Sequence, residues 1–83
     1  MTSQELDQSV RAALSDVAPE ADLSTLKASV AFRDQLDLDS MDFLRFVVAL
    51  NQRLGVEVPE SDYARLTTLD ACVTYLADHG AHP

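Results

Sequence analysis

Cysteine is almost absent from the sequence: Cys72 is the only one among 83 residues. A single cysteine excludes an internal disulfide, on which small secreted domains usually depend for stability. The first ten residues, MTSQELDQSV, lack the basic start and the apolar stretch of a secretory signal. Both absences favour a cytoplasmic protein whose stability comes from packing.

Long hydrophobic runs and positive charges are also scarce. No apolar stretch approaches the length of a membrane span, so membrane insertion is not expected. Six lysines and arginines accompany fourteen aspartates and glutamates, which gives a net charge of −8. A field of this sign repels phosphates, and nucleic acid is therefore excluded as a partner. The hydrophobic content of 47% nevertheless predicts a folded chain.

The length allows one small domain, to which we assign residues 1–83. A chain of this size has no room for a separate catalytic domain. Nothing in the sequence demands an oligomer, so we expect a monomer. Any function must use the surface of this domain or a cleft in its core.

Hydrophobic spacing predicts an all-α fold whose first helix covers residues 2–17. Thr2 and Glu5 form the capping-box pattern of a helix start, and Pro19 marks the end. The apolar stripe of this helix consists of Leu6, Val10, Leu14 and Val17.

A second main helix is predicted over residues 40–54, with Asp39 as its N-cap, Asp42 in its first turn and Gly55 as its left-handed end. At the helical period its apolar residues form two stripes. The inner stripe, expected in the core, consists of Phe43, Phe46, Val47, Leu50 and Leu54. The outer stripe consists of Met41, Leu44 and Val48. Exposed apolar stripes usually mark interfaces, so we expect the outer stripe to bind partners; the alternative is burial against a loop.

The last third of the chain predicts two more helical segments. Pro59 has a backbone angle suited to a helix start, so residues 60–66 are expected to form a short helix. A third main helix begins after Thr67 or Thr68 and ends before Gly80. Its buried stripe is expected to contain Leu69, Cys72, Val73 and Leu76.

Residues 18–39 form a long connection after the first helix. They contain many apolar residues but show no sustained period, so we expect them to pack across the core. Residues 24–30 are a candidate for a short helix within this connection. The predicted fold is a small up-down four-helix bundle, with three main helices, one short helix and this long loop.

No cluster of residues predicts a metal site or an active site. The aspartates between residues 34 and 42 fail the spacing of a calcium loop and are interpreted as solvated charges at a helix start. Cys72 lies on a core face, roughly 10 Å along the helix from His79, which is too far for a catalytic pair. We predict no functional role for His79 or His82, which lie near the end of the sequence. We therefore expect no enzymatic activity.

The residues around Ser40 provide the functional prediction. A serine at a helix start is ordinary by itself. Here Asp39, Ser40 and Met41 open an apolar helix, and a Val-Pro pair and a threonine follow, in DLDSMDFLRFVVALNQRLGVEVPESDYARLTTLDACVTYL. This combination resembles the acyl carrier protein family, closely over this segment and more loosely over the first helix.

The resemblance implies a carrier that is not itself an enzyme. In this family a phosphopantetheinyl transferase attaches 4′-phosphopantetheine from coenzyme A to the serine, and the thiol of the arm holds acyl groups as thioesters. The implied attachment residue is Ser40, and Asp39 is implied to help present it to the transferase. A phosphodiester there would lie at the positive end of a helix dipole. The other implied partners are acyl-loading and acyl-processing enzymes.

The resemblance also assigns two sets of residues. The partner-binding surface is predicted to consist of Met41, Asp42, Leu44, Arg45 and Val48. The core, together with any cleft that shields an acyl chain, is predicted to consist of Phe43, Phe46, Val47, Leu50, Leu54, Val58, Leu66, Leu69, Val73 and Leu76.

Several residues depart from the family pattern. Asp37 stands where a glycine is typical, and Arg45 stands where many members carry an acid. Arg45 would repel partners with basic docking patches, so we predict a specialised carrier of a fatty-acid, polyketide or related pathway. The ring of Phe43 is expected to shorten or close an acyl cleft.

Two other interpretations stay open. An aminoacyl or peptidyl carrier of a nonribosomal-type pathway would share the modification and differ in its loading enzyme. A non-catalytic acidic helical adaptor would bind a partner through the outer stripe and use Ser40 only at a helix start.

Overall fold

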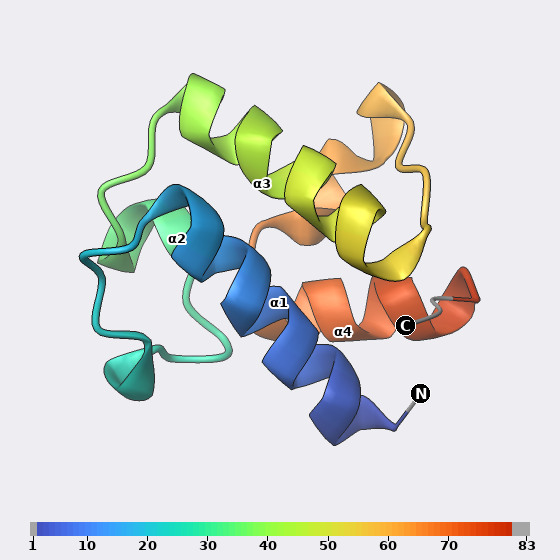
Figure 1. Cartoon of the computed structure of the whole chain (residues 1–83), viewed down its shortest axis with the longest axis horizontal. Helices are drawn as coiled ribbons and strands as arrows, with labels where there is room; N and C mark the ends of the chain where they lie inside the picture. Colours follow the sequence, from blue (N-terminus) through green and yellow to red (C-terminus); the bar gives the residue numbers. More distant parts are fainter. Residues whose placement is uncertain (1, 81–83) are drawn as a thin grey trace.

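The structure is a computed structural model that describes residues 2–80, and Figure 1 shows helices joined by loops. No strand occurs in this range. The elements are α1 (Ser3–Val17), η1 (Leu23–Thr25), α2 (Phe32–Gln35), α3 (Ser40–Leu54), η2 (Glu60–Leu66) and α4 (Leu69–Asp78). The predicted all-α bundle of three main helices is therefore confirmed.

Helix α1 begins as its sequence predicts. The backbone N–H of Glu5 donates to the Thr2 hydroxyl, and the N–H of Thr2 donates to the Glu5 carboxylate, both at 3.1 Å. Such a capping box satisfies backbone donors that no helical carbonyl can reach. Thr2 is thus the cap, and Ser3 is the first helical residue.

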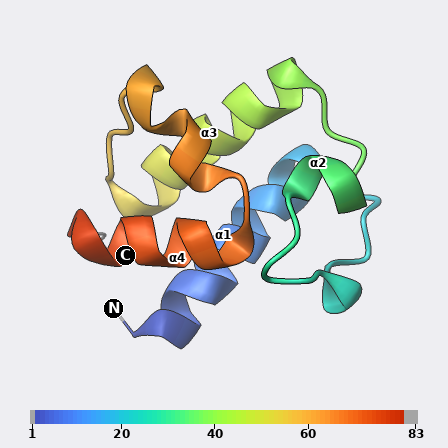
Figure 2. The ribbon, with the colours of Figure 1, turned by 180° about the vertical axis from the view of Figure 1, so that it is seen from behind.

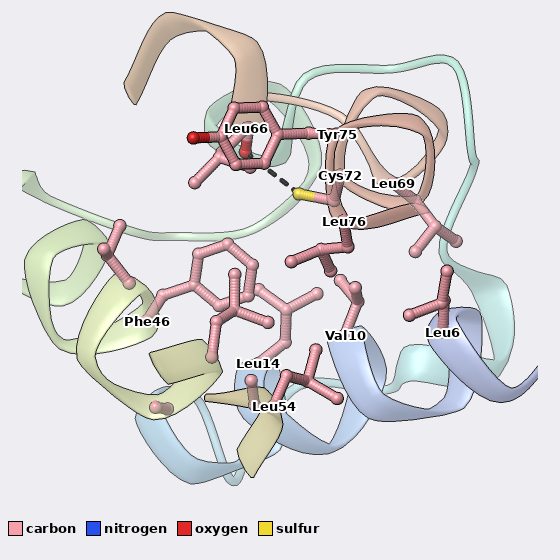
Figure 3. Packing of buried hydrophobic residues seen from close by; sticks show 14 of the residues in the cluster. Leu6, Val10, Leu14, Phe46, Leu54, Leu66, Leu69, Cys72, Tyr75 and Leu76 are labelled. Atoms are coloured by element: carbon pink, nitrogen blue, oxygen red, sulfur yellow. Dashed lines mark hydrogen bonds between the residues drawn. The ribbon is translucent and has the colours of Figure 1, made fainter. Parts of the chain in front are cut away.

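The three main helices enclose one apolar core (Figure 3). Helix α1 packs against both α3 and α4. Leu14 from α1, Leu50 from α3 and Leu76 from α4 are completely buried. Burial of this kind is the main favourable term in folding. The core also contains Tyr75, which the stripe predicted for the last helix omitted.

The long connection does contain short helices, but neither spans residues 24–30, of which only Ser24 and Thr25 are helical. The two helices are η1 and α2, and η1 begins where Asp22 accepts a hydrogen bond from the N–H of Ser24. Gln35, the last residue of α2, accepts a hydrogen bond from the N–H of Lys27 at 2.8 Å and donates one to its carbonyl at 2.7 Å. Phe32 and Leu38 are buried, so the connection is pinned to the core as expected.

The predicted short helix over residues 60–66 is present as the 3₁₀ helix η2. Seen from behind in Figure 2, it leads directly into α4, against which it packs. The tighter turn places Tyr63 and Leu66, three residues apart, on one face of η2. None of the helices in the described range has the length and apolar character needed to cross a membrane.

Two predicted core residues lie at the edge of the core. Val58, in the loop before η2, and Val73, on α4, are half-buried and pack against the buried cluster. On α4 the buried positions are Leu69, Cys72, Tyr75 and Leu76, so the stripe is rotated away from Val73. The assignment of Val73 to the fully buried stripe was therefore wrong, whereas Val58 contacts the core from the loop before η2.

Candidate functional site

Ser40 is the first residue of α3, the helix at the top of Figure 1, and its side chain is exposed. It follows Asp39, the extended N-cap residue. The first backbone N–H groups of a helix lack helical acceptors and, with the helix dipole, favour an anion. The arrangement presents an accessible hydroxyl where a negatively charged substituent is favoured.

Asp39 and Asp42 fix the start of α3 by a reciprocal pair of hydrogen bonds. The N–H of Asp42 donates to Asp39 Oδ1 at 2.8 Å, and the N–H of Asp39 donates to Asp42 Oδ2 at 3.3 Å. The sequence predicted the N-cap but not the second bond, since Asp42 is shorter than the usual glutamate or glutamine. Both carboxylates are held by backbone donors beside the Ser40 position.

The outer stripe of α3 is exposed, as predicted. Among residues 2–80, the large hydrophobic side chains left exposed are Met41, Leu44 and Val48, at 61%, 42% and 54%. Arg45 lies among them, and its Nη1 is 4.0 Å from Asp42 Oδ1. The pair is loose and its arginine is exposed, so Arg45 remains available to a partner.

A cavity of about 380 Å³ opens beside Ser40. Helix α3 contributes Ser40, Phe43 and Leu44 to its lining, and η2 contributes Glu60, Tyr63 and Ala64. Phe32 and Arg33 of α2 complete most of the remaining wall. The cavity therefore lies where α2, α3 and η2 meet.

Phe43 is half-buried and belongs to the cavity wall more than to the core. Its ring centroid lies 5.9 Å from that of Tyr63, in an edge-to-face arrangement, and 6.1 Å from that of Phe46. Of the residues assigned in advance to the core and acyl cleft, Phe43 is the one that lines this cavity. Most of the other residues in that set are buried in the core, namely Phe46, Val47, Leu50, Leu54, Leu66, Leu69 and Leu76.

Sequence reasoning missed Phe32 and Tyr63 as cavity residues. For Tyr63 a signal existed, because its three-residue spacing to Leu66 fits one face of a 3₁₀ helix. For Phe32 no local signal existed, since a four-residue helix has too few positions to show a period. Its backbone N–H donates to the carbonyl of Thr67 at 2.8 Å, a contact between distant segments.

Cys72 and His79 make structural contacts. The Cys72 thiol is buried and donates to the carbonyl of Leu66 at 3.4 Å, and burial raises its pKa from 9.0 to about 12 (Figure 3). A protonated thiol of this kind is a poor nucleophile. The His79 ring stacks on Tyr75 with centroids 3.9 Å apart. His82 lies outside the described residues.

The acidic side chains do not assemble into a metal site in the part of the chain that the structure covers. There, no three histidine, cysteine, aspartate or glutamate side chains come together as potential ligands. Two of the clustered aspartates, Asp39 and Asp42, are used as helix caps. The chemistry of the site is therefore that of an exposed hydroxyl beside an apolar cavity.

Comparison with known proteins identifies a related family. Residues 8–76 match a family model described as "Phosphopantetheine attachment site". An acyl carrier protein of Rubrobacter xylanophilus is 31% identical over 65 residues, which cover 78% of this chain and 69% of that protein. An acyl carrier protein of Lactobacillus acidophilus is 25% identical over 79 residues, covering 95% and 98%. A mitochondrial acyl carrier protein of Arabidopsis thaliana is 30% identical over 60 residues, covering 72% and 48%.

Proposed function

The chain belongs to the acyl carrier protein family, with phosphopantetheine as its cofactor, and we propose that Ser40 carries the arm. Such a protein is a carrier and not an enzyme, and it requires partner enzymes that load and process its cargo. We propose that this chain is a cytoplasmic carrier and that residues 1–83 form a single monomeric carrier domain.

The strongest support for Ser40 is a comparison with Ser3. Both serines are exposed first residues of 15-residue helices, and each directly follows the N-cap residue of a capping box. Ser3 lies outside residues 8–76, which match the attachment-site family, while Ser40 lies inside them. Ser40 also borders the apolar cavity. Position at a helix start is therefore not sufficient, and the cavity beside Ser40 distinguishes the two sites.

The residues present fit the group. The Ser40 side chain is exposed, and the helix start behind it favours the charge of a phosphodiester. In the attachment reaction the Ser40 oxygen bonds to the phosphorus that bears pantetheine. The phosphoanhydride bond of coenzyme A breaks, 3′,5′-adenosine diphosphate leaves, and the hydroxyl proton passes to a base of the transferase. Once attached, the arm supplies a thiol that holds an acyl group as a thioester.

Asp39 has a positioning role in this proposal. Its carboxylate accepts the N–H of Asp42 at 2.8 Å and thereby fixes the backbone that presents Ser40. Met41, Asp42, Leu44, Arg45 and Val48 are proposed to form the surface that partner enzymes bind. Exposed apolar side chains around a charged one are suited to such contact.

The proposed pathway is a specialised one, in fatty-acid, polyketide or related metabolism. An arginine at position 45 would repel a partner whose docking surface is basic. The acyl class of cargo is favoured over an aminoacyl one because the relatives are named acyl carrier proteins. An adaptor that uses Ser40 only at a helix start has no specific observation in its favour.

Intact mass measurement tests the attachment residue. The protein is incubated with coenzyme A, magnesium and a broad-specificity phosphopantetheinyl transferase. The wild type and the Ser3→Ala variant are expected to gain one phosphopantetheine group, and Ser40→Ala is expected to gain none. Circular dichroism should show the same helical content for all three, because both substitutions replace an exposed first-turn residue and leave the capping boxes intact.

The control separates the outcomes. If Ser40→Ala still gained a phosphopantetheine group and Ser3→Ala did not, the arm would be attached to α1, and the proposal would be contradicted. No gain on the folded wild type with several transferases would also contradict it.

A further inference from the structure

The cavity beside Ser40 has aromatic walls. Phe32, Phe43 and Tyr63 all line it, from α2, α3 and η2 respectively. The rings of Phe43 and Tyr63 meet edge to face at 5.9 Å. The cavity has a volume of about 380 Å³, near the lower limit of small-molecule sites, which range over about 300–1,000 Å³.

One wall of the cavity is backed by a second pair of rings, because Phe32 lines the cavity and also contacts Phe46. Phe32 and Phe46 lie edge to face at 5.5 Å, and both are almost completely buried. Leu66, on η2, is also completely buried. Because interiors are close-packed, a chain that passed beyond Phe32 would have to displace these side chains.

The wall that carries Tyr63 is fastened to the rest of the bundle. The Tyr75 hydroxyl of α4 donates to Asp62 at 2.7 Å, and the Arg65 guanidinium lies 4.8 Å from the centre of the Tyr75 ring. At the other end of η2, the N–H of Phe32 donates to the Thr67 carbonyl. Widening the cavity by moving η2 would break contacts on both sides of it.

We propose that the cavity accepts an acyl group whose apolar part is about the size of a single aromatic ring, and that a long saturated chain stays outside. This inference rests on the carrier function proposed above. Aromatic walls favour a flat apolar group through edge-to-face and stacked contacts. To extend past Phe32, a long chain would have to displace the almost completely buried rings of Phe32 and Phe46.

The test compares two cargoes on the same arm. The transferase loads Ser40 from benzoyl-coenzyme A or from hexadecanoyl-coenzyme A, and intact mass verifies each product. Cleavage of each thioester by hydroxylamine is then compared with cleavage of the same acyl group on free pantetheine. The benzoyl thioester is expected to be cleaved roughly two- to tenfold more slowly on the protein, the range of one aromatic contact. The hexadecanoyl thioester is expected to show a ratio near one.

Two variants change the cavity in opposite directions. Ala64→Leu adds bulk from an exposed position in the lining and is expected to abolish protection of the benzoyl group. Phe43→Ala widens the cavity and is expected to protect the hexadecanoyl group. Ala77→Leu makes the same change at an exposed α4 position outside this lining and should leave both ratios unchanged. In the wild type, nuclear Overhauser contacts between the benzoyl ring and Tyr63 are expected, and they would report directly that the ring occupies the cavity.

The outcomes separate the two proposals. A mass gain on Ser40 followed by stronger protection of the hexadecanoyl group, or equal protection of both, would overturn the inference about cargo and leave the carrier function standing. No mass gain on the wild type would overturn the carrier function, and the cargo inference with it.

Discussion

The two apolar stripes of α3 both contain leucine and valine but differ in their surroundings. Leu50 and Leu54 of the inner stripe are buried against α1 and the rest of the core. Leu44 and Val48 of the outer stripe are 42% and 54% exposed. A leucine thus serves either purpose, and only the neighbouring elements decide which.

This difference separates stability from function on a single helix. Residues of the inner stripe lose their burial when the chain unfolds, so substitutions there act on the free energy of unfolding. Residues of the outer stripe are solvated in both states, so substitutions there leave it almost unchanged. In the proposed carrier, their effects should appear only with a partner.

The largest expected effect is on the inner stripe. Leu50→Ala removes a completely buried side chain and should lower the free energy of unfolding by about 2–5 kcal/mol. Val48→Ala, two residues earlier on the outer stripe, should change it by less than about 0.5 kcal/mol. Urea denaturation of both variants measures the contrast. Equal losses would mean that the outer stripe is covered in solution.

The buried side should also respond to high pH through Cys72. Burial raises the pKa of its thiol from 9.0 to about 12, so between these values the unfolded chain loses a proton that the folded chain retains. The thiol's contribution to stability is fully present below pH 9 and is lost as the pH rises toward 12. At pH 10 the loss should be about 1 kcal/mol relative to neutral pH.

Comparison with Cys72→Ala isolates the thiol. Tyr75 also has a raised pKa, chiefly through burial and then through its hydrogen bond to Asp62, so it contributes in the same direction at alkaline pH. The variant retains Tyr75, and its free energy of unfolding should fall less between pH 7.5 and pH 10 than that of the wild type. Identical slopes for the two proteins would show that the thiol is not buried in solution.

The outer stripe should respond only in the presence of a partner. Met41→Ala is expected to lower the kcat/KM of a phosphopantetheinyl transferase by about fivefold, equivalent to about 1 kcal/mol, because apolar side chains at the centre of an interface contribute at this scale. Its urea denaturation should match that of the wild type. Thr74→Ala, at an exposed position on α4, provides a control that should retain full kcat/KM.

The same contrast explains what could be predicted from the sequence. Helices α1, α3 and α4 were predicted because their stripes and caps are local, as with Thr2 and Glu5 or Asp39 and Gly55. The exposure of the outer stripe was predicted because it is angularly separate from the inner one. These features depend on residues a few positions apart.

Features made by distant segments were not predicted. The cavity combines Phe32, Phe43 and Tyr63 from three elements, and no spacing along the chain relates them. The helical turns of the long connection depend on contacts such as those of Gln35 with Lys27. Val73 was predicted to be fully buried, but Tyr75 occupies that part of the core. A tyrosine can be buried there because its hydroxyl donates a hydrogen bond to Asp62 on η2, a distant segment.

The smallest expected effect concerns the charge within the outer stripe. Arg45 would repel a ketosynthase whose docking patch is basic, so Arg45→Ala should raise the rate at which such an enzyme acts on the loaded carrier. The gain should be about two- to threefold at low salt and should disappear near 1 M salt, where the screening length is about 3 Å. The free energy of unfolding should change by less than about 0.5 kcal/mol, since the Arg45–Asp42 pair is exposed and loose.

Arg53→Ala is the matched control for this experiment. It makes the same change in net charge on the same helix, but Arg53 lies in the last turn and pairs with Asp16 of α1 at 3.0 Å. If the repulsion is local to the outer stripe, Arg53→Ala should leave the rate with the ketosynthase near the wild-type value. An equal gain from both variants would mean that the partner responds to the overall charge of −8, and Arg45 would then have no special part in partner choice.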